Sequence, residues 1–179
     1  MFSLLSSLLT FSSAAVAQEA PAEPTFSQKY AAPSPADPTS DIRHGIRLGY
    51  VYAEGARKAG LDNNHLFAMG WEANFRIAGN DKIDFLVVPN VMVLGVNQGV
   101  FIPSGNLLVG ASVGHFFEVG AGANLTLGTE QPLHMVVAVG ITPKVGQLQV
   151  PISLSYIPDN DGNFRAALTT GVNWGTKAK

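Results

Sequence analysis

Residues Phe67–Ile77 read FAMGWEANFRI, and large apolar side chains alternate along them with small or polar ones. Successive side chains of a β-strand point to opposite faces, whereas a helical period would mix the two sets. The first set is Phe67, Met69, Trp71, Ala73, Phe75 and Ile77, and the second is Ala68, Gly70, Glu72, Asn74 and Arg76. The stretch therefore predicts a strand whose apolar face covers either a protein core or lipid.

The same alternation recurs through the chain from residue 43 onward, between segments rich in turn residues. Regularly spaced alternating segments without a helical period predict an all-β fold. We expect eight strands, at residues 43–55, 65–78, 83–95, 107–115, 117–127, 133–141, 148–156 and 164–174. Their connections are alternately long and short, which is typical of up-and-down strands in a transmembrane barrel. The sequence thus predicts an eight-stranded antiparallel up-and-down β-barrel over residues 43–175.

Composition excludes several classes of protein. Charged residues make up 13% of the 179 residues, about half the usual share of roughly 25%. The net charge of −2 and the lack of a basic block give no electrostatic reason to expect nucleic-acid binding. The chain has no cysteine, so it has no disulfide framework and no zinc–thiolate site. No apolar run reaches the roughly 18 residues of a membrane-spanning helix.

The two ends of the chain differ in composition from the predicted barrel. Residues 1–17 are apolar and end in Ala15-Val16-Ala17, which predicts a secretory signal peptide cleaved after Ala17. An amphipathic or buried N-terminal helix is the alternative. Residues 18–42 are rich in proline and alanine and predict a disordered periplasmic tail. Residues 176–179 form a short C-terminal tail.

The smaller face of the predicted strands indicates which face points inward. A solvent-facing surface normally carries about 25–35% charged residues, but this face is mostly Gly, Ala, Ser, Thr and Asn. Small residues suit the narrow interior of an eight-stranded barrel. We expect one polar network inside it, made of Arg47, Glu72, Asn74, Arg76, Glu118, Asn124 and Arg165. Its expected role is a plug that closes the barrel, and the alternative role is a narrow gate.

Aromatic residues fall on the apolar face, many of them near strand ends. Membrane barrels carry girdles of aromatic side chains at the two interfaces. The candidates for these girdles are Tyr50, Tyr52, Trp71, Phe75, Phe117, Tyr156, Phe164 and Trp174. In the alternative interpretation they are core aromatics of a soluble β-protein.

Two features do not fit the membrane barrel, and the first of them favours the alternative of a soluble periplasmic or secreted β-barrel that binds a small apolar ligand inside. Residues 83–95 are apolar on both faces, which is typical of a strand buried on both sides. Pro89 and Pro151 lie within predicted strands, although a closed barrel has no free edge. For the barrel we therefore expect bulges at these two prolines.

The last predicted strand contains Thr169-Thr170-Gly171-Val172-Asn173-Trp174, a polar-x-Gly-hydrophobic-x-hydrophobic pattern. With the eight alternating segments, it resembles the small eight-stranded outer-membrane β-barrels of Gram-negative bacteria, such as the membrane domain of outer membrane protein A. The resemblance covers residues 43–175, and the chain departs from it by continuing to Lys179 instead of ending on an aromatic. It implies contact with outer-membrane lipid, insertion by the barrel assembly machinery, both termini in the periplasm, and an interior without a wide pore.

The sequence indicates neither an enzyme nor a cofactor. His44, His65, His115 and His134 are scattered, and none has metal-ligand spacing to another histidine or a carboxylate. No Gly-x-Ser-x-Gly elbow and no phosphate-binding glycine pattern is present. The histidines are best interpreted as residues at strand ends.

Overall fold

The computed structural model describes residues 42–80, 82–129, 131–146, 148–159 and 162–176. The predicted signal peptide over residues 1–17 lies outside the described residues. So do residues 18–41 of the predicted tail and residues 177–179 at the C-terminus.

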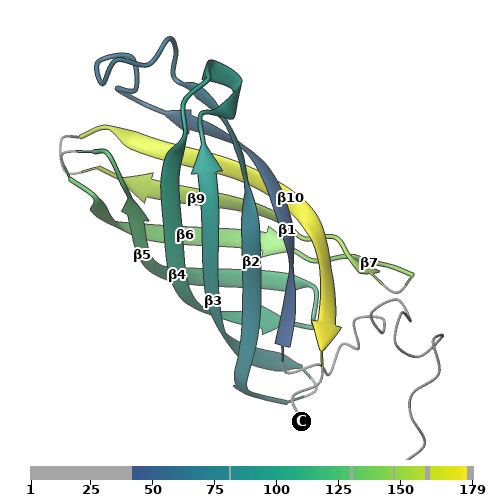
Figure 1. Cartoon of the computed structure of the whole chain (residues 1–179). Coiled ribbons are helices and arrows are strands. Elements are labelled where there is room, and N and C mark those ends of the chain that lie inside the picture. Colours follow the sequence, from purple (N-terminus) through teal and green to yellow (C-terminus); the bar gives the residue numbers. More distant parts are fainter. Residues whose placement is uncertain (1–41, 81, 130, 147, 160–161, 177–179) are drawn as a thin grey trace, which may run out of the picture. The chain divides into compact units, whose positions relative to one another are not determined.

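The described chain forms a closed, eight-stranded antiparallel β-barrel, as predicted (Figure 1). The barrel closes because β1 pairs with both β2 and β10. Its elements are β1 (Ile42–Ala53), β2 (His65–Gly79), β3 (Ile83–Leu94), the 3₁₀ helix η1 (Val96–Gln98), β4 (Ile102–Val113), β5 (Phe117–Thr126), β6 (Leu133–Ile141), β7 (Lys144–Val145), β8 (Leu148–Gln149), β9 (Ile152–Pro158) and β10 (Phe164–Thr176). Strands β8 and β9 follow one path beside β10, and β7 forms a small hairpin with β8. None of the helical structure in the described residues is long and apolar enough to cross a membrane.

The register of the strands determines how strongly they tilt. A line of directly opposite residues leaves β1 at Ile42, crosses all the other strands, and returns to β1 at Tyr52, ten residues further along. With a rise of about 3.3 Å per residue and strands about 4.8 Å apart, a stagger of this size tilts eight strands by about 40°. This tilt lies within the range that closed barrels adopt.

The structure corrects the predicted start of the fourth strand. Strand β4 begins at Ile102 and not at residue 107, because residues 102–106 pair with the end of β3. The Pro103-Ser104-Gly105-Asn106 segment has the composition of a turn, but cross-strand pairing overrides that local preference.

The bulges expected at Pro89 and Pro151 are absent. On either side of Pro89, β2 and β3 keep one register, with Glu72 opposite Asn90 and Phe75 opposite Val87. At Pro151 the strand path is interrupted between β8 and β9, again without a change of register along β10. Each proline therefore removes a backbone donor without adding a residue. The register between β2 and β3 shifts elsewhere, between Arg76 and Ala78.

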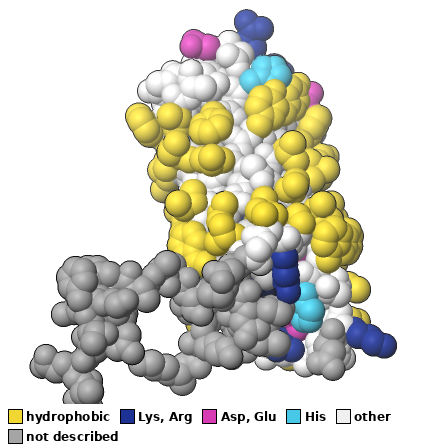
Figure 2. Space-filling view, turned by 90° about the vertical axis from the view of Figure 1, so that its right-hand side faces the viewer, with side chains coloured by type: hydrophobic (Ala, Val, Ile, Leu, Met, Phe, Trp, Pro, Cys, Tyr) yellow, Lys and Arg dark blue, Asp and Glu magenta, His cyan; other side chains and the backbone are white. Residues whose placement is uncertain are grey.

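The large apolar side chains of the strands point outward, and the small and polar ones point inward. Ile46, Val109 and Leu133 are more than half exposed, whereas Arg47 and Asn124 are 1% exposed. Figure 2 shows the resulting apolar surface, with charged side chains gathered at its two ends. The charged residues of the eight barrel strands all lie on the inward parity, and they are Arg43, Arg47, Glu72, Arg76, Asp84, Glu118 and Arg165.

Strand β3 follows the same rule, so it is not buried on both sides, and its two apolar faces do not have the meaning that favoured the soluble alternative. Phe85 and Val91 are exposed on its outer face, and Leu86 and Met92 are buried on its inner face. The strand is apolar throughout because its inner residues belong to the apolar part of the interior. Its two polar inner residues are Asp84 and Asn90.

The two ends of the barrel differ. Ile42 and Thr176 are paired at one end, which also holds the short connections after β2 and β4 (Figure 1); we call it the turn end. Residues 54–64 and η1 lie at the other end, the loop end. A buried apolar cluster occupies the loop end of the interior, and it consists of Val51, Ala53, Ala56, Leu66, Ala68, Met92, Leu94 and Ala167.

Candidate functional site, a polar network inside the barrel

The centre of the network is the Glu72 carboxylate, which has three polar neighbours, one arginine and two asparagines. Arg47 on β1 donates a hydrogen bond to Oε1 of Glu72 on β2. Asn74 Nδ2 donates to the same oxygen at 3.2 Å, and Asn90 Nδ2 lies 3.4 Å from Oε2. The Arg47 side chain is 1% exposed, so this ion pair is shielded from water. A buried charge is tolerated only when it is paired and hydrogen-bonded, and Glu72 meets both conditions.

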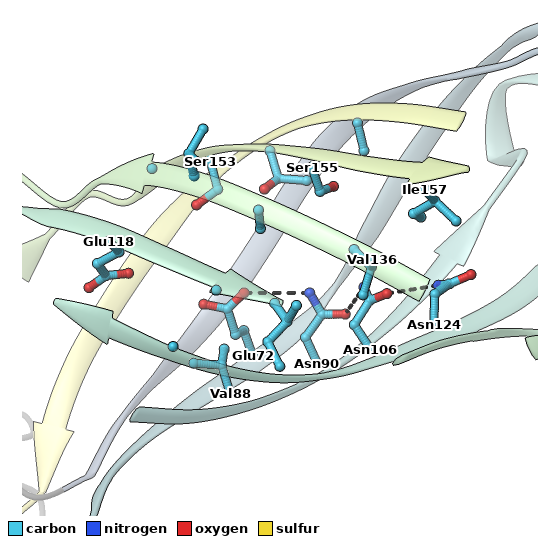
Figure 3. Close-up of a pocket in the computed structure, with 18 of the residues that line it drawn as sticks. Glu72, Val88, Asn90, Asn106, Glu118, Asn124, Val136, Ser153, Ser155 and Ile157 are labelled. Carbon is cyan, nitrogen blue, oxygen red and sulfur yellow. Dashed lines mark hydrogen bonds between the residues drawn. The ribbon is translucent and has the colours of Figure 1, made fainter. Parts of the chain in front are cut away.

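From Glu72 the network continues along the barrel wall through three asparagines. Glu72, Asn90, Asn106 and Asn124 are directly opposite one another on the consecutive strands β2, β3, β4 and β5. Asn106 Nδ2 donates to Asn90 Oδ1 at 2.9 Å, and Asn124 Nδ2 donates to Asn106 Oδ1 at 2.7 Å. Figure 3 shows this row of side chains. The row follows the wall and leaves space beside it, so it is not a plug across the whole lumen.

The row ends in a hydroxyl cluster and an arginine. Thr126 Oγ1 donates to Asn124 Oδ1 at 2.9 Å, and the hydroxyls of Ser104 and Thr126 lie 3.1 Å apart. Arg165 Nη1 donates to Thr126 Oγ1 at 2.7 Å. Strands β10 and β5 are three positions apart in the ring of eight, so the arginine reaches across part of the lumen at the loop end.

A second set of side chains crosses the lumen at the turn end. Arg43 on β1 lies 3.4 Å from Glu118 Oε1 on β5, and these strands are opposite each other in the ring. Arg43 Nη1 also donates to Gln149 Oε1 at 3.2 Å. Gln149 is completely buried and Arg43 is 6% exposed. These three residues bridge the lumen at the turn end of the interior.

A third set fastens the rim of the turn end. Asp84 on β3 is buried, and Oδ1 of its carboxylate lies 2.6 Å from Arg76 Nε on β2. Its other oxygen lies 2.8 Å from Nδ1 of His115, in the connection between β4 and β5. His115 has a φ of 54°, so this residue holds a left-handed turn conformation while its ring contacts Asp84.

The space beside the wall row is a cavity of about 90 Å³. Its polar lining includes Glu72, Asn74, Glu118, Asn124 and Arg165, and its apolar lining includes Val51, Leu86, Met92, Leu94, Val136 and Ile157. Figure 3 shows Ser153 and Ser155 on the opposite side of it from Glu72 and Asn90. A space of this volume with several polar groups on its wall holds several water molecules.

The structure thus places the seven expected network residues inside the barrel, but not in one network. Arg47, Glu72, Asn74, Asn124 and Arg165 belong to the connected wall row. Glu118 belongs to the turn-end set with Arg43, and Arg76 belongs to the rim set with Asp84.

Sequence reasoning missed the other members of these three groups, which are Arg43, Asp84, Asn90, Ser104, Asn106, Thr126 and Gln149. Asn106 lay outside the predicted fourth strand, and Asn90 lay in a strand whose parity was obscured by apolar residues on both faces. Arg43 is the first residue of the first predicted strand, and it occupies one of the alternate positions that point inward. This alternation could have identified it as an interior residue.

No protein-family model matches the chain, and no curated protein matches it. Within the described residues, no three His, Cys, Asp or Glu side chains are grouped so as to hold a metal ion. A functional proposal for this chain therefore rests on the physical chemistry of its barrel.

Proposed function

We propose that the protein spans a bacterial outer membrane as a β-barrel of structural or small-pore type, with a polar and closed interior. The observation that carries the proposal is the outward face of the strands. It has large apolar side chains and no Asp, Glu, Lys or Arg, because all such residues of the eight barrel strands lie on the inward parity. A surface in water would carry about 25–35% charged residues.

The dimensions of the barrel support the same proposal. The line of directly opposite residues that runs once around the barrel begins at Ile42 and ends at Tyr52, so its two ends on β1 are ten residues apart. At about 3.3 Å per residue and a tilt of about 40°, they extend about 25 Å along the barrel axis. This length equals the height of the apolar band on membrane barrels, about 25 Å.

Aromatic side chains gather near the loop end of the outward face. Tyr50 and Tyr52 each lie beside His65, with ring centroids 5.7 and 5.6 Å apart respectively. Phe164 lies 5.8 Å from Tyr52 and 5.7 Å from Tyr156. These amphipathic rings suit the boundary between lipid and water.

The remaining aromatic candidates lie lower on the barrel. His44 packs between Trp174 and Trp71, with ring centroids 5.0 and 5.9 Å away. Phe75 pairs with Ile42 at the turn end, and Phe117 pairs with Val113 there. Trp71 is opposite Ile46, four residues into β1, so in the proposed membrane barrel its backbone would lie inside the apolar band and not at its edge. We propose all but Trp71 as interfacial residues.

The outer membrane, rather than another membrane, is favoured by two features of the sequence. The first is the predicted signal peptide over residues 1–17, and the second is the pattern Thr169–Trp174 that resembles the signal read by the barrel assembly machinery. This pattern lies in β10, the last strand of the barrel. The proposed partners are therefore outer-membrane lipid and, during insertion, that machinery.

The soluble alternative places the apolar face of the strands in a core. In the structure this face points outward, so a soluble barrel would expose it to water, and an exposed apolar surface of this extent is characteristic of an interaction site or a membrane surface. Extraction distinguishes the two: we expect the protein to stay with membranes through high-salt and alkaline washes and to require detergent. Recovery in the detergent-free soluble fraction would favour the alternative.

Recordings in planar bilayers test the closed interior. We expect the purified barrel to show no steady conductance, because Arg43, Glu118 and Gln149 close one end of the lumen and the apolar cluster occupies the other. A reproducible conductance that changes in Glu72→Ala would show instead that the wall row borders an open path.

A further inference from the structure

The loop end of the internal cavity is bounded by the buried apolar cluster. Val51, Met92, Leu94 and Ala167 belong to that cluster and also line the cavity. Residues 54–64, which connect β1 to β2, add the buried Ala56 to the cluster, and Leu61 packs against it. This connection therefore packs against the side chains that separate the cavity from the loop end.

Most of the side-chain hydrogen bonds between the 54–64 segment and the neighbouring connection come from one residue, Gln98. Oε1 of Gln98, in η1, accepts hydrogen bonds from the backbone N–H groups of Asp62 at 2.9 Å and Asn63 at 3.4 Å. Its Nε2 donates to the carbonyl oxygens of Asn63 at 3.1 Å and His65 at 2.9 Å. Asn97 Nδ2 also donates to the His65 carbonyl, at 3.0 Å. A single glutamine thus bonds to donors and acceptors on both sides of Asn63.

We infer that residues 54–64 form a lid, latched by Gln98, through which the internal cavity is reached from the loop end. The inference needs only the closed barrel and goes beyond the proposed membrane role. The latch bonds lie at the exposed or part-buried surface, where water replaces a broken hydrogen bond at little cost. At the turn end, by contrast, opening would separate the buried charge of Arg43 from Glu118. The lid is the weaker of the two closures.

The lining of the cavity defines what it admits. Amide and carboxylate groups of Asn74, Asn124 and Glu118 face it together with Leu86, Val136 and Ile157. With a volume of about 90 Å³, the cavity suits water and small solutes that combine a polar group with an apolar one.

Cysteine accessibility tests the lid, because the chain contains no cysteine. Ser155→Cys places one thiol in the cavity lining (Figure 3), and its rate of reaction with a small charged methanethiosulfonate reports access. We expect slow modification in Ser155→Cys alone and a rate at least tenfold higher when Gln98→Ala is added. Lys58→Ala, at an exposed residue of the same connection, should leave the rate unchanged. Leu61→Ser, which weakens the apolar contact and keeps the latch, should also raise the rate.

Two results would overturn the lid. One is equal rates with and without Gln98→Ala and Leu61→Ser in barrels whose folding is shown by circular dichroism. The other is acceleration by Arg43→Ala or Arg165→Ala but not by Gln98→Ala, which would place access at the turn end or at the arginine that crosses the lumen. The labelling can be done in micelles or in buffer, so failure of the membrane proposal leaves it informative.

Discussion

At the scale of single residues, the wall row contains a buried ion pair between Arg47 and Glu72. Glu72→Ala would leave the Arg47 guanidinium, 1% exposed, without a carboxylate. Removing one partner of a buried pair typically costs about 3–5 kcal/mol. We expect Glu72→Ala to lower the free energy of unfolding by about that amount, measured by urea titration of the refolded barrel.

Glu54→Ala is the matched control, since Glu54 is exposed in the connection after β1. Its free energy of unfolding should stay within about 0.5 kcal/mol of the unmodified protein. Equal stability of Glu72→Ala and Glu54→Ala would show that the network is not structural.

Gly122 on β5 shows why small residues face the interior. A Cβ at this position would lie 1.9 Å from the backbone oxygen of Leu107 on β4, closer than atoms can approach. The two strands must move apart to admit even a methyl group, and overpacking of this kind costs about 1–3 kcal/mol. We therefore expect Gly122→Ala to lower the urea midpoint and the yield of refolded barrel.

Gly105→Ala provides the comparison on the outward face of β4. There a Cβ would lie 3.5 Å from the oxygen of Asn90, an ordinary contact distance. The variant should refold like the unmodified protein, and a loss of refolding as large as that of Gly122→Ala would contradict the steric explanation.

At the scale of elements, the outward face of the middle strands distinguishes lipid from water. Val109 on β4 is 59% exposed and is flanked by Val87 and Ala121 on neighbouring strands. In a membrane, an arginine near the middle of the apolar band costs about 2–4 kcal/mol, whereas a water-exposed strand tolerates it. We expect Val109→Arg to reduce stability by this amount in lipid vesicles.

The control for this substitution is Val145→Arg in β7, a hairpin strand that pairs with β8 and is also well exposed. Val145→Arg should lower the stability in vesicles only slightly. If Val109→Arg proves as stable in vesicles as Val145→Arg, the outward face does not contact lipid.

The sequence predicted the strands well where one face is purely apolar and the other small or polar. β2, β5 and β6 begin where the alternation begins, and the closed antiparallel order agrees with eight such segments joined by alternately long and short connections. Prediction failed where local preference and pairing disagree, as in residues 102–106, which look like a turn but join β4. For β3 the strand itself was predicted correctly, but the sequence did not show which face points inward, because an interior that is partly apolar hides the difference between its two faces.

The sequence predicted which kinds of side chain point into the barrel, but it did not predict which of them hydrogen-bond to one another. Parity identifies which side chains point inward, but hydrogen bonding around the wall depends on register. Glu72, Asn90, Asn106 and Asn124 form one row because four strands bring them directly opposite one another. No spacing within a single segment of the sequence reveals that alignment.

On the scale of the whole molecule, the barrel is a closed cylinder with an apolar outer surface and a partly polar interior, in which polar side chains bridge strands at both ends. Arg43 and Glu118 connect opposite strands at the turn end, and Arg165 reaches Thr126 at the loop end. These contacts join strands that backbone pairing does not, so they stiffen the cylinder against flattening. Such an object is suited to a lipid bilayer, where closure satisfies every strand edge.

The most direct test of this account is the gel mobility of membrane-fraction protein in SDS, unboiled and boiled. A closed barrel that lives in lipid should resist SDS, so the protein should partition with the outer membrane and change its apparent size only after heating. Identical mobility in both samples, with the protein in the soluble fraction, would contradict a membrane-spanning barrel.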